Sequence, residues 1–228
     1  MLVHGLGVSS SYFRPLLRVL DGRADVVAPD LPGFGCTPAP REALGIGALA
    51  DALASFLEEL ELGRPLLLGN SLGCQVVVDT AVRRPELVGA LALVGPTIDP
   101  AAPRLLNQAA RLVVDGFREH PLAVPGLVAD YLRVGPRRIV ATARSALRDR
   151  VEDKLRRVTV PAVVIHGSRD PLAPERWCEH ATSLLPHAHM VTIRGAAHAA
   201  HWSHPRPTAA ALEPLLARLR PGTPQPLR

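Results

Sequence analysis

The stretch that decides the fold is Leu66-Leu67-Leu68-Gly69-Asn70-Ser71-Leu72-Gly73-Cys74-Gln75-Val76-Val77-Val78. An apolar run, a turn with the spacing G-x-S-x-G and a second apolar run predict a buried strand, a sharp turn and a helix. The two glycines leave room for a strained backbone that holds the Ser71 hydroxyl clear of the sheet. The helix would direct its N-terminal N–H groups toward charge that develops beside Ser71. An ordinary strand-to-helix turn that happens to hold a serine is the alternative interpretation.

Outward from this stretch, strand and helix patterns alternate, which predicts an α/β fold with a mostly parallel central sheet and helices on both faces. In addition to the strand that begins at Leu66, the apolar runs predict strands at 1–4, 25–30, 89–94, 160–165 and 189–194. Helical spacing predicts helices at 11–20, 45–62, 71–84, 174–185 and 205–220.

Between the strands at 89–94 and 160–165 the alternation stops, and helical patterns broken by prolines take its place. We therefore expect a core formed by residues 1–95 and 158–220, an inserted helical lid at 96–157, and a disordered tail at 221–228. Six lid arginines are candidates for drawing in an anionic substrate, although solvated helix faces are the favoured explanation. These six are Arg111, Arg118, Arg133, Arg137, Arg138 and Arg144.

The composition narrows the class of protein. With 228 residues, 47% of them hydrophobic, the chain is long enough for one domain with a sizeable core. No apolar run is long enough to span a bilayer, and the first residues lack the features of a signal peptide. The three cysteines are scattered, which favours a reducing cytoplasmic setting. The net charge of +5 suggests a nucleic-acid partner, but with 4% aromatic residues and no basic run among them, we expect none.

Two loops on the same side of the predicted sheet carry groups that could activate Ser71. Asp170 follows the strand at 160–165, and His198 follows the strand at 189–194. Because the carboxyl ends of parallel strands meet at one edge, Asp170 can orient His198, and His198 can take the proton of Ser71.

Alternatives remain for both of these groups. His201 and His204 are rival bases, Asp99 is a rival acid, and three close histidines could also indicate a metal site. Without a carboxylate or cysteine at ligand spacing beside the histidines, we expect no metal.

The sequence resembles the α/β-hydrolase superfamily, in its lid-bearing serine hydrolase branch, from residue 1 to about residue 220. The stretches that carry the resemblance are His4-Gly5-Leu6-Gly7, Asp30-Leu31-Pro32-Gly33-Phe34-Gly35, the turn from Gly69 to Gly73, His166-Gly167-x-x-Asp170 and Gly195-x-x-His198. The resemblance implies a Ser71–Asp170–His198 triad without a cofactor, and oxyanion donors at the backbone N–H groups of Leu6 and Leu72. Gly5, Gly7 and Asn70 are expected to lie against the substrate.

The implied activity is hydrolysis of a small-molecule carboxylester or a related acyl bond. The chain is also similar to the meta-cleavage-product hydrolases, which cleave a carbon–carbon bond, but Ala199 stands where those enzymes usually have tryptophan. Cofactor-free haloperoxidases and non-catalytic small-molecule receptors of the same superfamily are further alternatives. The oligomeric state cannot be inferred from the sequence.

In the fold that the chain resembles, the strand before His4-Gly5 is the third of the sheet. The sequence holds nothing before Met1 that could form the first two strands. We therefore expect the natural protein to start roughly two dozen residues upstream, at ~5–6 residues per strand. On this interpretation residues 26–28 form an exposed sheet edge.

Overall fold

The computed structural model describes residues 1–102 and 104–219, so the tail predicted at 221–228 lies outside the described residues. Within this part, five parallel strands form one sheet in the order β1-β2-β3-β4-β5. Their bounds are β1 Leu2–Val3, β2 Leu66–Asn70, β3 Ala90–Val94, β4 Ala162–Gly167 and β5 Ala188–Ile193. Since every strand runs in the same direction, all of their carboxyl ends lie at one edge.

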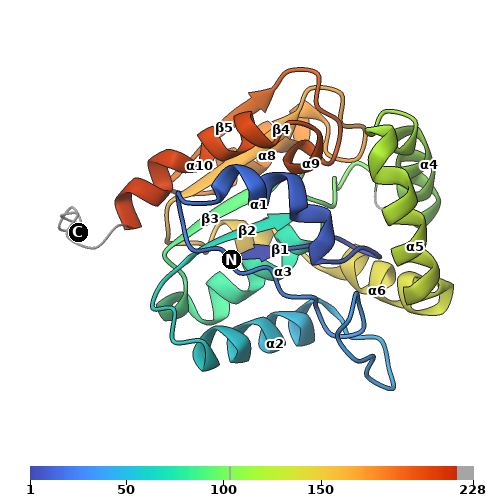
Figure 1. Cartoon of the computed structure of the whole chain (residues 1–228), viewed down its shortest axis with the longest axis horizontal. Coiled ribbons are helices and arrows are strands. Elements are labelled where there is room, and N and C mark those ends of the chain that lie inside the picture. The colour runs from blue at the N-terminus through green and yellow to red at the C-terminus, as the bar shows by residue number, and fades with distance from the viewer. Residues whose placement is uncertain (103, 220–228) are drawn as a thin grey trace.

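Helices cover both faces of the sheet, as the sequence predicted (Figure 1). One apolar core contains buried side chains of α2, α3 and α8, and a second contains those of α1 and α10 on the opposite face. The inner strands are buried on both faces, which explains their continuous apolar sequence. The helices of the two faces are α1 Arg14–Leu20, α2 Ile46–Glu59, α3 Leu72–Arg83, α8 Glu175–Leu184, α9 Ala200–Ser203 and α10 Pro205–Leu219.

Four helices lie between β3 and β4, in the segment where the sequence predicts a lid. They are α4 Leu105–Gly116, α5 Val124–Val134, α6 Pro136–Arg148 and α7 Val151–Leu155. Figure 1 shows α4, α5 and α6 together at one end of the molecule, beside the sheet rather than on either of its faces. Short 3-10 helices at Ser10–Phe13, Pro85–Leu87 and Pro121–Ala123 complete the described elements. The function of this segment as a lid remains a prediction.

The strand predicted at 25–30 is wrong. These residues form no strand, although the Leu2 backbone N–H donates to the Val27 carbonyl at 2.8 Å. This single hydrogen bond does not extend into a strand pairing. The neighbouring strand β1 is only two residues long, and Pro29 has no N–H to donate to it. Residues 26–28 are half-buried.

None of the helices in the described residues is both long and apolar enough to cross a membrane.

Candidate active site

Ser71 lies at the turn between β2 and α3 in a strained backbone conformation. Its φ is +55° and its ψ is −122°, and its N–H donates to the Val94 carbonyl at 3.0 Å. The flanking glycines are required by close packing. A Cβ on Gly69 would lie 2.5 Å from the Gly73 carbonyl oxygen, and one on Gly73 would lie 2.3 Å from the Val3 carbonyl oxygen. The G-x-S-x-G spacing is therefore a steric requirement of this turn.

Asp170 and His198 meet beyond the ends of β4 and β5. His198 Nδ1 lies 2.8 Å from Asp170 Oδ2, and the other carboxylate oxygen accepts the backbone N–H groups of Leu172 at 2.8 Å and Ala173 at 3.0 Å. These bonds fix the carboxylate, and the carboxylate in turn makes Nδ1 the protonated nitrogen of His198.

The other imidazole nitrogen of His198 is free to act on a substrate. Nε2 is buried and has no hydrogen-bond partner among the described residues, and His198 and Ser71 line the same cavity. Burial by itself would lower the pKa of His198. The charge of Asp170 and its hydrogen bond, together with the nearby Asp115 and Glu119, raise that pKa to about 9.

The residues proposed from the resemblance as oxyanion donors adjoin this turn. A Cβ on Gly5 would lie 3.1 Å from the Ser71 Cβ, so the loop that carries Leu6 is packed against the serine. Leu72 is the first residue of α3, where a backbone N–H has no acceptor within the helix. Both leucines line the cavity.

A buried histidine holds the Leu6 loop in place. His4 Nδ1 donates to the Gly5 carbonyl at 2.8 Å, and His4 Nε2 accepts the Leu31 N–H at 2.9 Å. Burial lowers the pKa of His4, which favours the neutral ring that this bonding pattern requires. His4 therefore ties the first loop to the turn that begins at Asp30.

Neither of the two rival histidines, His201 and His204, is among the residues that line the cavity beside Ser71. His201 is fully buried, and its ring packs against Tyr12 and Phe13 with centroids 5.0 Å and 4.7 Å away. Burial lowers the pKa of His201 to about 3. The third histidine, His204, has its Nδ1 2.9 Å from Ser203 Oγ.

The rival acid Asp99 has cationic partners of its own. Arg111 Nη1 lies 2.9 Å from one oxygen of Asp99, and Arg176 Nη2 lies 2.5 Å from the same oxygen. Among the described residues, the carboxylate that contacts His198 Nδ1 is that of Asp170.

The cavity beside Ser71 has a volume of about 810 Å³ and is lined mainly by apolar residues of α4, α5 and α6. Gly5 and Asn70 are among the lining residues, but the Asn70 amide donates to the carbonyls of Val94 and His198. Gly7 is not in the lining. A Cβ there would lie 2.5 Å from the Tyr131 ring, so this glycine allows Tyr131 to lie against the loop.

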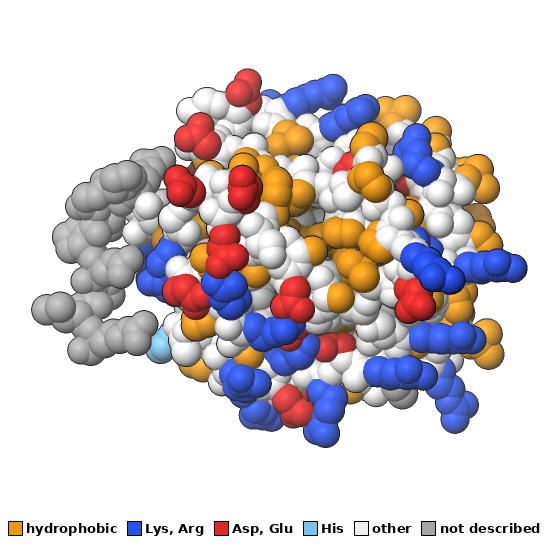
Figure 2. All heavy atoms as spheres, turned by 90° about the horizontal axis from the view of Figure 1, so that it is seen from below, with side chains coloured by type: hydrophobic (Ala, Val, Ile, Leu, Met, Phe, Trp, Pro, Cys, Tyr) orange, Lys and Arg blue, Asp and Glu red, His pale blue; other side chains and the backbone are white. Residues whose placement is uncertain are grey.

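The surface around the α4 and α5 end of the molecule is also apolar. Figure 2 shows hydrophobic side chains interspersed with basic ones at this end. Leu106 is 81% exposed, Phe117 87% and Leu132 78%. Since Leu106 and Leu132 also line the cavity, apolar surface continues from the exterior into it.

Two buried carboxyl groups that the sequence analysis did not identify also line the cavity, one in the last turn of α4 and the other just beyond that helix. Asp115 Oδ1 accepts the His198 backbone N–H at 3.1 Å, and Glu119 Oε1 accepts the Ala199 N–H at 2.6 Å. Burial raises the pKa of Asp115. Burial, followed by the charge of Asp115, raises the pKa of Glu119 to about 7. Local patterns could not have identified them, because their hydrogen bonds to the His198 loop join residues 83 and 80 positions apart.

The lid arginines do not line this cavity. None of the six candidates is among the described residues that line it. Arg118 Nη1 donates to the Arg169 carbonyl at 2.9 Å, Arg133 contacts Asp130 at 3.0 Å, and Arg138 donates to the Pro40 carbonyl at 2.6 Å. The charged groups that do line the cavity are Asp115, Glu119 and His198.

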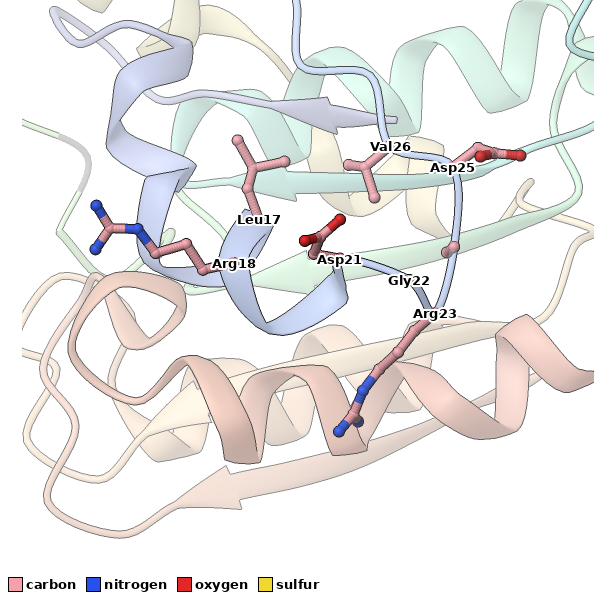
Figure 3. Close-up of a pocket in the computed structure, with 8 residues that line it drawn as sticks. Leu17, Arg18, Asp21, Gly22, Arg23, Asp25 and Val26 are labelled. Carbon is pink, nitrogen blue, oxygen red and sulfur yellow. The ribbon is translucent and has the colours of Figure 1, made fainter.

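A second hollow of about 710 Å³ lies between α1 and the segment that follows it, and shares no lining residue with the first (Figure 3). In Figure 3 the Arg23 side chain extends toward α10, where Nη1 lies 3.3 Å from Glu213 Oε1. Of the labelled residues, Leu17 and Val26 are partly buried and the others are exposed, and none of them lines the cavity beside Ser71.

A parallel sheet covered on both faces, with a strained serine between a strand and a helix, defines the class of α/β hydrolases. The sequence model of the Alpha/beta hydrolase family matches residues 1–211, and the chain belongs to this family.

Several relatives share most of the chain. A pimeloyl-[acyl-carrier protein] methyl ester esterase of Neisseria meningitidis is 29% identical over 235 residues, which covers 92% of this chain and 89% of that protein. A biotin biosynthesis bifunctional protein of Cellvibrio japonicus is 28% identical over 93% of this chain, which spans only 46% of that longer protein. The solved structure of a thermophilic esterase from Thermogutta terrifontis matches this chain with a TM-score of 0.81 and 24% identity. The match covers 95% of this chain and 88% of the esterase chain, and it supports the fold alone.

Proposed function

We propose that this chain is a serine hydrolase that cleaves a carboxylester or a related acyl bond of a small molecule, with neither a cofactor nor a metal. The observation that carries the proposal is the state of His198. Asp170 holds Nδ1 at 2.8 Å, while Nε2 is left without a partner in the cavity that contains Ser71. That is the arrangement a base requires if it is to take a proton from a serine hydroxyl.

In the proposed mechanism, Ser71 Oγ attacks the substrate carbonyl carbon as its proton passes to His198 Nε2. The oxyanion is bound by the backbone N–H groups of Leu6 and Leu72, each contributing ~3 kcal/mol of transition-state stabilisation. The imidazolium then protonates the leaving alcohol. Water, deprotonated by His198, releases the acyl group and regenerates Ser71.

The ester is favoured because a relative that covers most of this chain is named as a methyl ester esterase. A cavity of about 810 Å³ is in the range of small-molecule sites. We further propose a reducing cytoplasmic setting, since Cys36, Cys74 and Cys178 are all free thiols in the described residues.

A panel of chromogenic esters of varied acyl length, run beside a 2-hydroxy-6-oxo-dienoate, tests the reaction type. We expect ester hydrolysis that falls by on the order of 10⁶ in kcat in Ser71→Ala and in His198→Ala. His204→Ala is the matched control, because its ring contacts Ser203 instead of the cavity, and it should retain most activity. Cleavage of the dienoate with no turnover of any ester would replace the ester proposal with the carbon–carbon one.

A further inference from the structure

The charges around the cavity are unbalanced. Three carboxyl groups, those of Asp115, Glu119 and Asp170, surround the single imidazole of His198. Asp115 is 4% exposed and Glu119 7%. Neither forms an ion pair with an arginine or lysine among the described residues, and the cation that acts on both is His198. The His198 imidazolium is one positive charge against three carboxyl groups, and an excess of buried negative charge is costly, so the cavity favours a ligand that supplies positive charge.

One carboxylate oxygen in this group is available for such a ligand. Glu119 Oε1 accepts the Ala199 N–H, and the Glu119 side chain lies within hydrogen-bonding reach of Asp115. Oε2 is buried and has no N–H or O–H donor among the described residues, so when both groups are ionised no protein donor serves this oxygen. Glu119 lines the same cavity as Ser71 and His198. The unpartnered oxygen and the unpartnered His198 Nε2 therefore belong to residues that line one cavity.

Two aromatic residues share this cavity with the carboxyl groups. Tyr12 and Tyr131 line the cavity, and the charges of both Asp115 and Glu119 act on Tyr12, while that of Asp115 acts on Tyr131. Burial, followed by the charge of Asp115, raises the pKa of Tyr131 to about 12, so its hydroxyl stays neutral. Neutral aromatic faces beside carboxylates attract an ammonium group.

We propose that Glu119, with Asp115 and the rings of Tyr12 and Tyr131, makes the cavity selective for acyl compounds that carry a protonated amine and excludes those that carry a carboxylate. This inference rests on the proposed function for the position of the acyl bond beside Ser71. It reverses the expectation that lid arginines draw in an anion, because those arginines do not line the cavity whereas the two carboxyl groups do.

Binding of three probes of equal length tests the selectivity without turnover. Hexylammonium, 1-hexanol and hexanoate are titrated calorimetrically into the full chain at pH 8.5, where an alkylamine is still protonated. We expect hexylammonium to bind at least tenfold tighter than hexanol, and hexanoate to bind more weakly than hexanol. Glu119→Gln keeps an oxygen for the Ala199 N–H and should abolish the amine preference, while hexanol binding stays within threefold and reports that the variant is folded.

Glu152→Gln is the matched control, since Glu152 contacts His180 at 3.2 Å and does not line the cavity, and it should leave all three affinities unchanged. Asp115→Asn should weaken hexylammonium selectively in the same way. Hexanol binding as tightly as hexylammonium to the natural chain, or equal losses for all three probes in Glu119→Gln, would overturn the inference.

Hydrolysis of 4-nitrophenyl 6-aminohexanoate and 4-nitrophenyl hexanoate separates this inference from the proposed function. Selective binding of hexylammonium with neither ester cleaved would contradict the proposed function and leave the cation site standing. Cleavage of both esters at equal kcat/KM, lost in Ser71→Ala, would support the hydrolase and contradict the selectivity.

Discussion

At the scale of single residues, the protonation of His198 governs the proposed chemistry. The negative groups around the ring outweigh the effect of burial and raise its pKa to about 9, so at neutral pH the imidazole is mostly charged. A charged ring cannot accept the serine proton. We therefore predict that kcat/KM for a neutral ester rises with pH through 7 and 8, is half-maximal near pH 9 and levels off about one pH unit higher.

The same experiment with Asp115→Asn provides the control. Removing one negative charge beside His198 should move the apparent pKa downward, while an amide oxygen remains to accept the His198 backbone N–H. A profile of the natural chain that is already flat from pH 6.5 upward would contradict this description of the site.

At the scale of elements, two carboxyl groups hold the loop after β5. Asp115 lies in the last turn of α4, and Glu119 lies four residues later. Asp115 and Glu119 accept successive backbone N–H groups, those of His198 and Ala199. A buried donor left without an acceptor costs ~1–3 kcal/mol. In Asp115→Ala we predict faster amide hydrogen exchange at His198, read by NMR, with the amides of β3 unchanged as an internal control. Equal exchange at His198 in both proteins would show that α4 does not hold this loop.

The elements show what the sequence could and could not predict. The strands and helices around Ser71, Asp170 and His198 were predictable, because apolar periodicity and turn residues are local signals. The segment at 25–30 has an equally good strand pattern, but a strand also needs a partner, and β1 offers it a single backbone bond. Asp115 and Glu119 were missed for a related reason. Their contacts join residues about 80 positions apart, and nothing in the local pattern of α4 indicates which loop it meets.

At the scale of the whole molecule, the buried Glu119 makes stability depend on pH. Burial and Asp115 raise its pKa from 4.5 to about 7, so the folded state holds the proton more tightly than the unfolded state does. The stabilisation is fully present below pH 4.5 and is lost as pH rises through 7. Relative to the natural chain, Glu119→Gln should gain on the order of 3 kcal/mol in free energy of unfolding between pH 4.5 and pH 8.

Urea denaturation at both pH values, read by circular dichroism, measures this difference. Glu213→Gln is the control, because Glu213 is an exposed partner of Arg23 on α10 and should show no such change. A difference between the natural chain and Glu119→Gln that stays constant with pH would mean that Glu119 has an ordinary pKa in the folded protein.

The account as a whole depends on Ser71 being a nucleophile. A fluorophosphonate probe reacts with an activated serine, and mass spectrometry of the intact chain and of its peptides locates the label. The account predicts one label per chain, on the peptide that contains Ser71, with labelling abolished in Ser71→Ala and strongly slowed in His198→Ala. Labelling that persists in Ser71→Ala, or a natural chain that binds small molecules in this cavity yet ignores the probe, would contradict it.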